Sequence, residues 1–186
     1  MENIVLNLNN QILDGLDMKM SKHINNDEYK GYFNETSSKE HYRLLTYISS
    51  LYDNINILDI GTLKGCSALA LSTNKTNKVF SFNLDNQLDL NDAPENIEFI
   101  IDNVINGNYD NLILNSPIIL LDTFHDGTFE QEFLDYLLSI NYKGNLLLDD
   151  IHLNNEMNYF WNNIKLSKID ITHFGHSTGT GVVYFK

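Results

Sequence analysis

One stretch, residues 57–71, constrains the fold of this chain more than any other part of it. A short apolar run containing Asp59 is followed by two glycines, Gly61 and Gly65, and then by Ser67 and an apolar segment of helical character. This order predicts a strand, a tight turn and the start of a helix, as in a ligand-binding α/β unit. Glycines permit positive φ and close approach of a ligand. Unpaired N–H groups at the helix start favour an anionic or electron-rich ligand.

The turn differs from two common nucleotide-binding motifs. Leu63 stands where a dinucleotide fingerprint needs its second glycine, and Cys66 follows Gly65 where a Walker A loop needs lysine. The pattern Asp-x-Gly-x-x-x-Gly-x-Ser, from Asp59 to Ser67, instead resembles motif I of class I S-adenosylmethionine-dependent methyltransferases. The resemblance covers roughly residues 37–186. It implies an α/β, Rossmann-like fold: a seven-stranded, mostly parallel sheet with a C-terminal antiparallel hairpin and helices on both faces. It also implies that the turn passes under the methionine part of S-adenosylmethionine.

Composition limits the class of partner. The 186 residues fit one domain with a substantial core. The net charge is 12 − 25 = −13, which argues against a nucleic-acid partner and an anionic membrane surface. A small neutral or cationic substrate fits better. Cys66 is the only cysteine, which excludes an intrachain disulfide and a cysteine metal cluster. No stretch reaches the ~18 apolar residues of a membrane span, and the N-terminus lacks a basic signal-peptide region. We therefore expect a cytoplasmic protein.

Residues 1–36 are expected to form an N-terminal segment, and residues 37–186 the methyltransferase domain. Within the segment we expect a helix from about residue 4 to residue 20 and a loop over residues 25–35. Ser37 and Glu40 match a capping box. The helix after it should bury one face, which carries His41, Leu44, Leu45, Ile48 and Leu51. Arg43, elsewhere on that helix, is either a clamp over the cofactor or substrate or a solvated charge.

Strands and helices alternate through the rest of the chain. Strands are expected over residues 78–83, 97–101, 116–122 and 144–150, and two tail strands near 169–175 and 181–185 should form a hairpin. Helices should begin near Thr128 and after Asn154, and Gly107 should shorten or break the helix after Asn103.

Most of the predicted parallel strands end in a polar residue. These residues are Asp59, Asn83 with Asp85, Asp102, Asp122, and the pair Asp149–Asp150. Parallel strand ends share one sheet edge, where ligands bind. The resemblance implies that a cofactor is bound there by Asp59, Gly61, Thr62, Gly65, Ser67, Asn83, Asp85, Asp102, Asn103 and Asp122. Either Asn83 or Asp85 would contact the ribose hydroxyls. Asp102 would accept from the adenine amino group, cap a helix, or do both.

The strand-end acids also suggest a metal and a base. Asp122, Asp149 and Asp150, with no cysteine nearby, suit Mg²⁺ or another hard cation. The spacing Asp122-x-x-His125 with a later acid pair resembles metal-dependent sugar and small-molecule O-methyltransferases. That resemblance implies a metal held by the three acids, with His125 as the general base and Asp122 and Asp150 beside it. The pair here is Asp-Asp rather than Glu-Asp or Asp-Asn, so the alternative stays open that Asp150 caps the next segment and no metal binds.

His152 is a rival base, and His173 and His176 receive no role. We expect an S-adenosylmethionine-dependent methyltransferase acting on a sugar or small-molecule hydroxyl. The acceptor pocket should come from residues 1–40, the loops after the fourth and fifth strands, or a second copy of the chain in a homodimer. The alternatives are a non-catalytic cofactor- or partner-binding module of the same fold, an NAD-dependent oxidoreductase, which the missing glycine disfavours, and an RNA methyltransferase, which the charge disfavours.

Overall fold

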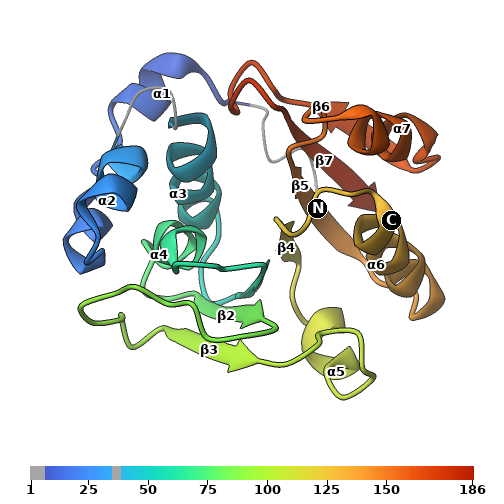
Figure 1. Cartoon of the computed structure of the whole chain (residues 1–186), viewed down its shortest axis with the longest axis horizontal. Coiled ribbons are helices and arrows are strands. Elements are labelled where there is room, and N and C mark those ends of the chain that lie inside the picture. Colours follow the sequence, from blue (N-terminus) through green and yellow to red (C-terminus); the bar gives the residue numbers. More distant parts are fainter. Residues whose placement is uncertain (1–6, 35–38) are drawn as a thin grey trace.

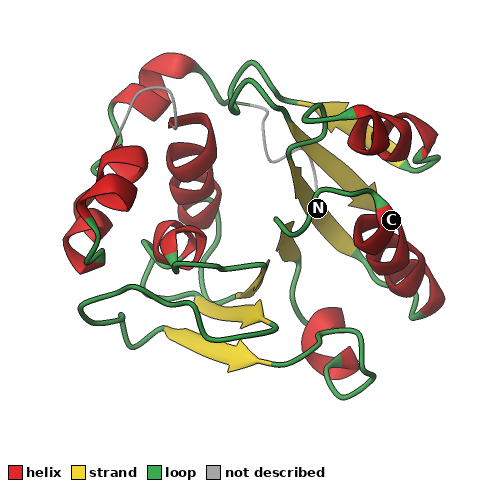
Figure 2. Cartoon of the chain, viewed as in Figure 1, coloured by secondary structure: helices red, strands yellow, loops and turns green. Residues whose placement is uncertain are grey.

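The computed structural model describes residues 7–34 and 39–186, and these residues form a seven-stranded sheet. The strand order is β3-β2-β1-β4-β5-β7-β6 (Figures 1 and 2). The strands are β1 Asn56–Ile60, β2 Lys78–Asn83, β3 Ile97–Ile101, β4 Ile118–Leu121, β5 Gly144–Asp149, β6 Ser167–Asp170 and β7 Thr180–Phe185. The pairs among β1 to β5 are parallel, whereas β7 pairs antiparallel with both β5 and β6. The predicted fold class is confirmed.

Helices cover both faces of the sheet. They are α1 Asn10–Asp14, η1 Lys19–His23, α2 Asp27–Asn34, η2 Lys39–Arg43, α3 Leu44–Ser50, α4 Cys66–Leu71, α5 Asp110–Leu114, α6 Thr128–Ser139 and α7 Asn155–Asn163. Apolar residues of α1 to α4 pack in one core and those of α5 to α7 in another, on the opposite side (Figure 1). Successive strand residues such as Ile57 and Leu58 belong to different cores, because side chains alternate across a strand.

The N-terminal segment differs from its prediction. The start of the helix expected over residues 4–20 lies outside the described residues, and from residue 7 onward that range holds the short helices α1 and η1 instead of one helix. The predicted loop contains α2. The loop prediction was wrong because Asn26 starts a helix: its Oδ1 accepts hydrogen bonds from the N–H groups of Glu28 and Tyr29, at 2.9 and 3.3 Å. Asparagine favours such starts because its side chain satisfies unpaired helical N–H groups.

Arg43 holds this segment against the domain. Its guanidinium donates hydrogen bonds to the carbonyl oxygens of Leu13, Leu16 and Asn34, at 3.3, 2.9 and 3.4 Å. It does not line the cavity described below, so the structure supports neither the clamp nor the solvated charge.

The start of the next helix is only partly described. Ser37 of the predicted capping box lies outside the described residues, so the box and the boundary at residue 37 stay predictions. The chain enters α3 through η2, a π-helical turn. His41, Leu44, Leu45 and Ile48 are buried as expected, whereas Leu51 is 40% exposed. Within residues 7–34 and 39–186, no helix has the length and apolar character needed to cross a membrane.

Candidate active site

The glycine turn between β1 and α4 is formed as predicted. Gly61 has φ +100° and Gly65 has φ +92°. A Cβ on Gly61 would lie 1.7 Å from the carbonyl oxygen of Asp122, and one on Gly65 would lie 2.8 Å from Leu90 Cδ1. The glycines are therefore required first by contacts within the protein: Gly61 lets β1 and β4 meet at the sheet edge.

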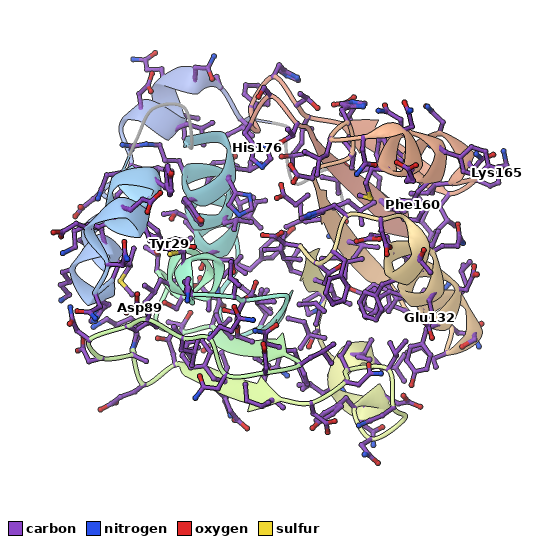
Figure 3. The ribbon with its side chains drawn as sticks, in the orientation of Figure 1. Tyr29, Asp89, Glu132, Phe160, Lys165 and His176 are labelled. Carbon is purple, nitrogen blue, oxygen red and sulfur yellow. The ribbon has the colours of Figure 1, made fainter. Side chains whose placement is uncertain are left out.

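A cavity of about 670 Å³ opens above this turn, at the carboxyl edge of the parallel strands. Tyr29 of α2 and Glu132 of α6 lie on opposite sides of it (Figure 3). Most of the predicted cofactor-binding residues line it, namely Gly61, Thr62, Ser67, Asn83, Asp85, Asp102, Asn103 and Asp122. Apolar side chains from the same strands and loops, including Ile60, Phe82 and Phe124, complete the wall. The cavity is thus polar at the strand ends and apolar between them.

The two candidate ribose ligands are linked. Asn83 Nδ2 donates a hydrogen bond of 3.3 Å to Asp85 Oδ1, and Gln87 Nε2 contacts both oxygens of Asp85 at 2.9 and 3.0 Å. On the next strand, Asp102 accepts from Tyr109 Oη at 2.8 Å and from the N–H of Asn103 at 2.7 Å. The helix α5 begins only at residue 110, so Asp102 organises a turn and not the start of a helix.

Asp59 and Gly65 lie outside the cavity wall. Asp59 is completely buried within β1, and its Oδ2 accepts a hydrogen bond of 2.6 Å from Ser81 Oγ on β2. Burial raises the pKa of this carboxyl to about 6, although hydrogen bonds from neighbouring hydroxyls oppose the shift. The position differs from the predicted cofactor contact because Asp59 belongs to the strand itself, whose side chains point into the layers and not over the edge.

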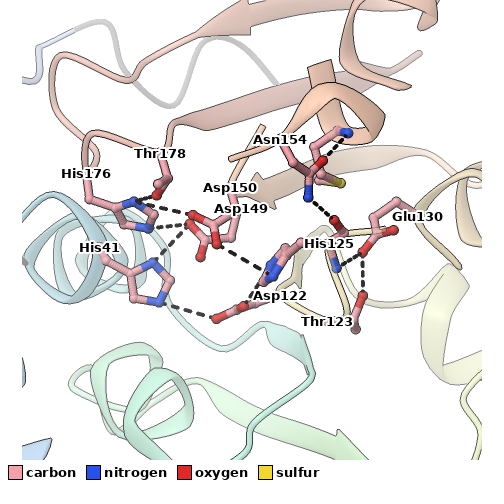
Figure 4. Close-up of polar contacts among 11 residues, drawn as sticks. His41, Asp122, Thr123, His125, Glu130, Asp149, Asp150, Asn154, His176 and Thr178 are labelled. Carbon is pink, nitrogen blue, oxygen red and sulfur yellow. Dashed lines mark hydrogen bonds and ion pairs between the residues drawn. The ribbon is translucent and has the colours of Figure 1, made fainter. Parts of the chain in front are cut away.

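Beside the cavity, three histidines and three aspartates form a closed alternating ring of contacts (Figure 4). The ring runs Asp122, His41, Asp149, His176, Asp150, His125 and back to Asp122. Each imidazole lies between two carboxylates, and each carboxylate lies between two imidazoles. Asp122 and His125 also line the cavity, so the ring and the cavity share one wall.

Contacts within the ring are short. His41 Nδ1 lies 3.3 Å from Asp149 Oδ1, and His41 Nε2 lies 3.6 Å from Asp122 Oδ2. His125 Nε2 lies 3.2 Å from Asp122 Oδ1, and its Nδ1 lies 3.5 Å from Asp150 Oδ2. Neither histidine has a solvent-exposed ring, with side chains only 9% and 15% exposed.

The close contacts in the ring shift the pKa values of its residues. Burial lowers the pKa of His41, but the neighbouring carboxylates, above all Asp149, raise it to about 9. The same balance raises the pKa of His125 to about 8, chiefly through Asp122. Burial and the charge of Asp149 raise the pKa of Asp122, whereas the two imidazoles beside Asp149 hold its pKa far below the usual range. Opposed shifts among neighbouring buried groups are typical of functional sites.

The backbone of His125 is strained and fixed from two sides. Its φ is +55°, in the left-handed region. Buried Glu130 accepts hydrogen bonds from the N–H of His125 and from Thr123 Oγ1, at 3.0 and 2.8 Å. Asn154 Nδ2 donates to the carbonyl of His125 at 2.7 Å, while its Oδ1 caps α7 through the N–H of Met157. These contacts sustain the strain and set the direction of the imidazole.

Comparison with known proteins supports the fold but gives no sequence relative. No family model matches the sequence, and no curated protein matches it. A methyltransferase from Podospora anserina, PaMTH1, solved with S-adenosylhomocysteine, matches over the whole of both chains with TM-score 0.59 and 14% identity. The O-methyltransferase TomG of Streptomyces achromogenes, solved with S-adenosylmethionine, matches over 98% of this chain and 93% of its own with TM-score 0.56 and 12% identity. An O-methyltransferase from Bacillus cereus, solved with S-adenosylhomocysteine, matches over 98% and 94% with TM-score 0.54 and 14% identity.

The chain has the class I methyltransferase fold. Within this methyltransferase fold the cavity lies where the resemblance implies a cofactor, and it is lined by the predicted cofactor-binding residues other than Asp59 and Gly65. Their roles stay predictions, because identity at this level speaks for the fold alone.

The metal that the resemblance implies can be tested against the donor atoms. Three carboxylates alone would suit Mg²⁺, which prefers oxygen ligands. In the described part of the chain, two groups have donor atoms all within 4.8 Å of one another: His41, Asp149 and His176, and Asp122, His125 and Asp149. Each contains a histidine and neither contains Asp150. The predicted all-carboxylate set therefore does not fit, because imidazoles lie between the carboxylates.

Sequence reasoning missed four members of this site. His41 was placed only on a buried helix face, His176 received no role, and Glu130 and Asn154 were not considered as supports of His125. The Asn154 cap was expected for α7, but its second contact depends on tertiary structure. His152, the rival base, pairs instead with Asp170, with Nε2 2.7 Å from Oδ2, and does not line the cavity.

Proposed function

We propose that this protein is an S-adenosylmethionine-dependent methyltransferase that acts on a hydroxyl group of a small molecule or sugar. One observation carries the proposal. In a fold shared with structures that hold S-adenosylmethionine or S-adenosylhomocysteine, the glycine turn and three strand-end polar groups line one cavity. The turn would take the methionine part, Asn83 and Asp85 the ribose, and Asp102 with Asn103 the adenine.

Methyl transfer requires that the acceptor oxygen be aligned with the methyl carbon of the sulfonium, and that a base accept the hydroxyl proton. The carbon–sulfur bond of the sulfonium breaks as the acceptor oxygen bonds to the methyl carbon. The hydroxyl proton leaves to a base, and S-adenosylhomocysteine departs neutral at sulfur. His125 is the proposed base because it lines the cavity beside Asp122, whose Oδ1 lies 3.2 Å from its Nε2 and would stabilise the imidazolium that forms. Glu130 and Asn154 would orient it through its backbone.

Calorimetric titration with S-adenosylmethionine and S-adenosylhomocysteine tests the binding half of the proposal. We expect both ligands to bind, and Asp85→Ala to weaken binding by roughly tenfold or more, the worth of a lost charged contact. Glu95→Ala is the matched control, since it removes the same charge from an exposed residue outside the cavity wall. Absence of heat with both ligands would overturn the proposal, and binding of NAD⁺ instead would favour an oxidoreductase.

Release of S-adenosylhomocysteine over a panel of sugars, catechols and phenols tests the catalytic half. We expect the wild type to turn over an acceptor from the panel, and His125→Ala to lose turnover while it retains its affinity for the cofactor. Cofactor binding with turnover unaffected by His125→Ala would remove the role of His125. Binding without turnover across the panel would favour the non-catalytic module.

A further inference from the structure

We infer that the ring holds a divalent transition metal through histidine nitrogens as well as carboxylate oxygens, with His41, Asp149 and His176 as its primary ligands. The inference does not depend on the proposed methyl transfer. Its starting point is geometric: one donor atom from each of these three residues lies within 4.8 Å of the other two. Two histidines and one carboxylate are a common ligand set for such ions.

The contact distances fit ligands that share an ion. Asp149 Oδ1 lies 2.8 Å from His176 Nε2 and 3.3 Å from His41 Nδ1. Two ligand atoms bound at about 2.1 Å to one ion, at octahedral or tetrahedral angles, lie about 3.0 to 3.4 Å apart. The separation of 3.3 Å lies within this range, and that of 2.8 Å lies just below it.

The directions of the donor groups make the same point. Buried polar atoms in proteins are nearly always hydrogen-bonded. Within the described structure Asp149 Oδ1, Asp150 Oδ1 and His125 Nε2 are buried and lack a well-aligned hydrogen bond, although an oppositely charged group lies within 2.8 to 3.5 Å of each. Asp149 is 6% exposed. Of these atoms, Asp149 Oδ1 belongs to the proposed ligand set, and its lack of an aligned hydrogen bond indicates a missing partner, because a ring held by protons alone would align its N–H groups on the oxygens.

The second nitrogen of His176 supports this assignment. Its Nδ1 is hydrogen-bonded to Thr178 Oγ1 in the loop before β7. Histidines that bind metals usually engage the other ring nitrogen in such a contact, which fixes the ring and directs the ligating nitrogen. Here the contact leaves Nε2 directed at Asp149.

The donor set selects the class of ion. Imidazole nitrogen suits Zn²⁺, Fe²⁺, Co²⁺ and Ni²⁺, whereas Mg²⁺ requires oxygen and retains water. A set of two imidazoles and one carboxylate, with His41 and Asp149 buried and Asp122 and His125 alongside, should therefore prefer a transition metal to Mg²⁺. This preference is the opposite of the one that the three aspartates alone suggest.

Titration of the metal-stripped protein with Co²⁺, followed by visible absorption, tests the inference without any assay of activity. We expect d–d bands stronger than those of aqueous Co²⁺, and displacement by Zn²⁺ but not by a roughly hundredfold excess of Mg²⁺. Pulsed electron paramagnetic resonance of added Mn²⁺ should show coupling to imidazole nitrogen. Mg²⁺ that binds as tightly as Co²⁺, Mn²⁺ without nitrogen coupling, or no metal binding at all would overturn the inference.

Variants assign the ligands. His41→Ala and His176→Ala should each weaken Co²⁺ binding roughly tenfold or more. His173→Ala is the matched control, because His173 is exposed three residues from His176 and outside both ligand groups. The wild-type resonance measurement stands even where a variant fails to fold. Titration of the metal-stripped protein with S-adenosylhomocysteine is read separately, so loss of cofactor binding beside intact metal binding would count only against the proposed function.

Discussion

At the level of single residues, Gly61 shows that a glycine of a ligand-binding motif can be required by packing within the protein, whether or not a ligand is bound. Gly61→Ala should destabilise the fold by more than about 3 kcal/mol, because the new Cβ would meet the Asp122 carbonyl at 1.7 Å. Gly107→Ala is the matched control: its φ is also positive, +87°, but no described atom lies within 4 Å of the new Cβ. It should cost only about 1 kcal/mol. Urea unfolding measures both, and equal losses would contradict the steric explanation.

Asp59 gives stability a pH dependence with a definite sign. Its pKa is about 6 when folded and 3.8 when exposed, so the folded state binds the extra proton between these values. Its contribution to stability is present below about pH 4 and is lost as pH rises to about 6, by roughly 3 kcal/mol in total. In Asp59→Asn this loss should disappear.

Urea unfolding at pH 4 and pH 7, followed by the fluorescence of Trp161, measures that difference between wild type and variant. Submicromolar protein is needed because the pI is near 4.6. If the variant and the wild type lose the same stability over this range, Asp59 does not ionise as described.

At the level of elements, the helix α7 and the loop that carries His125 are joined by one side chain. Asn154→Asp should keep the cap of α7, since a carboxylate still accepts from Met157, but lose the donor to the His125 carbonyl. Asn154→Ala should lose both. We expect about 1 kcal/mol for the cap and a similar loss for the carbonyl contact. Unfolding measurements should therefore find the wild type more stable than Asn154→Asp, and Asn154→Asp more stable than Asn154→Ala. Equal stability of the two variants would contradict the assignment of separate contributions to the cap and to the carbonyl contact.

At the level of the whole molecule, the proposed cofactor should stabilise the complete fold, because its cavity is lined by residues of α2, β1, α4, β2 and α6. S-adenosylhomocysteine at a hundred times its Kd should add about 2.7 kcal/mol, which raises the Tm by roughly 5 to 10 °C for a protein of this size. NAD⁺ at the same concentration should leave Tm unchanged. A thermal melt by circular dichroism measures both, and a larger shift with NAD⁺ would contradict the assignment of the cavity.

The sequence predicted most of the parallel-sheet half of this protein, because that half follows local rules. Apolar runs of strand length, glycines at positive φ and polar residues at strand ends are readable one segment at a time. Because the carboxyl ends of parallel strands share one edge of the sheet, Asn83, Asp102 and Asp122 could be predicted to lie near one another without information on packing. The prediction for the N-terminal segment was wrong for the converse reason: its short helices depend on Asn26 and on packing against η2 and α4.

The sequence by itself therefore determined the α/β order, the glycine turn and the row of polar strand ends. Only the tertiary structure decided which histidines join them. His41 arrives from the helix before β1, and His176 from the loop of the antiparallel hairpin, so these two residues near opposite ends of the chain meet at Asp149. No spacing in the sequence encodes that meeting, because it depends on how the last strands pair and on how the first helices pack.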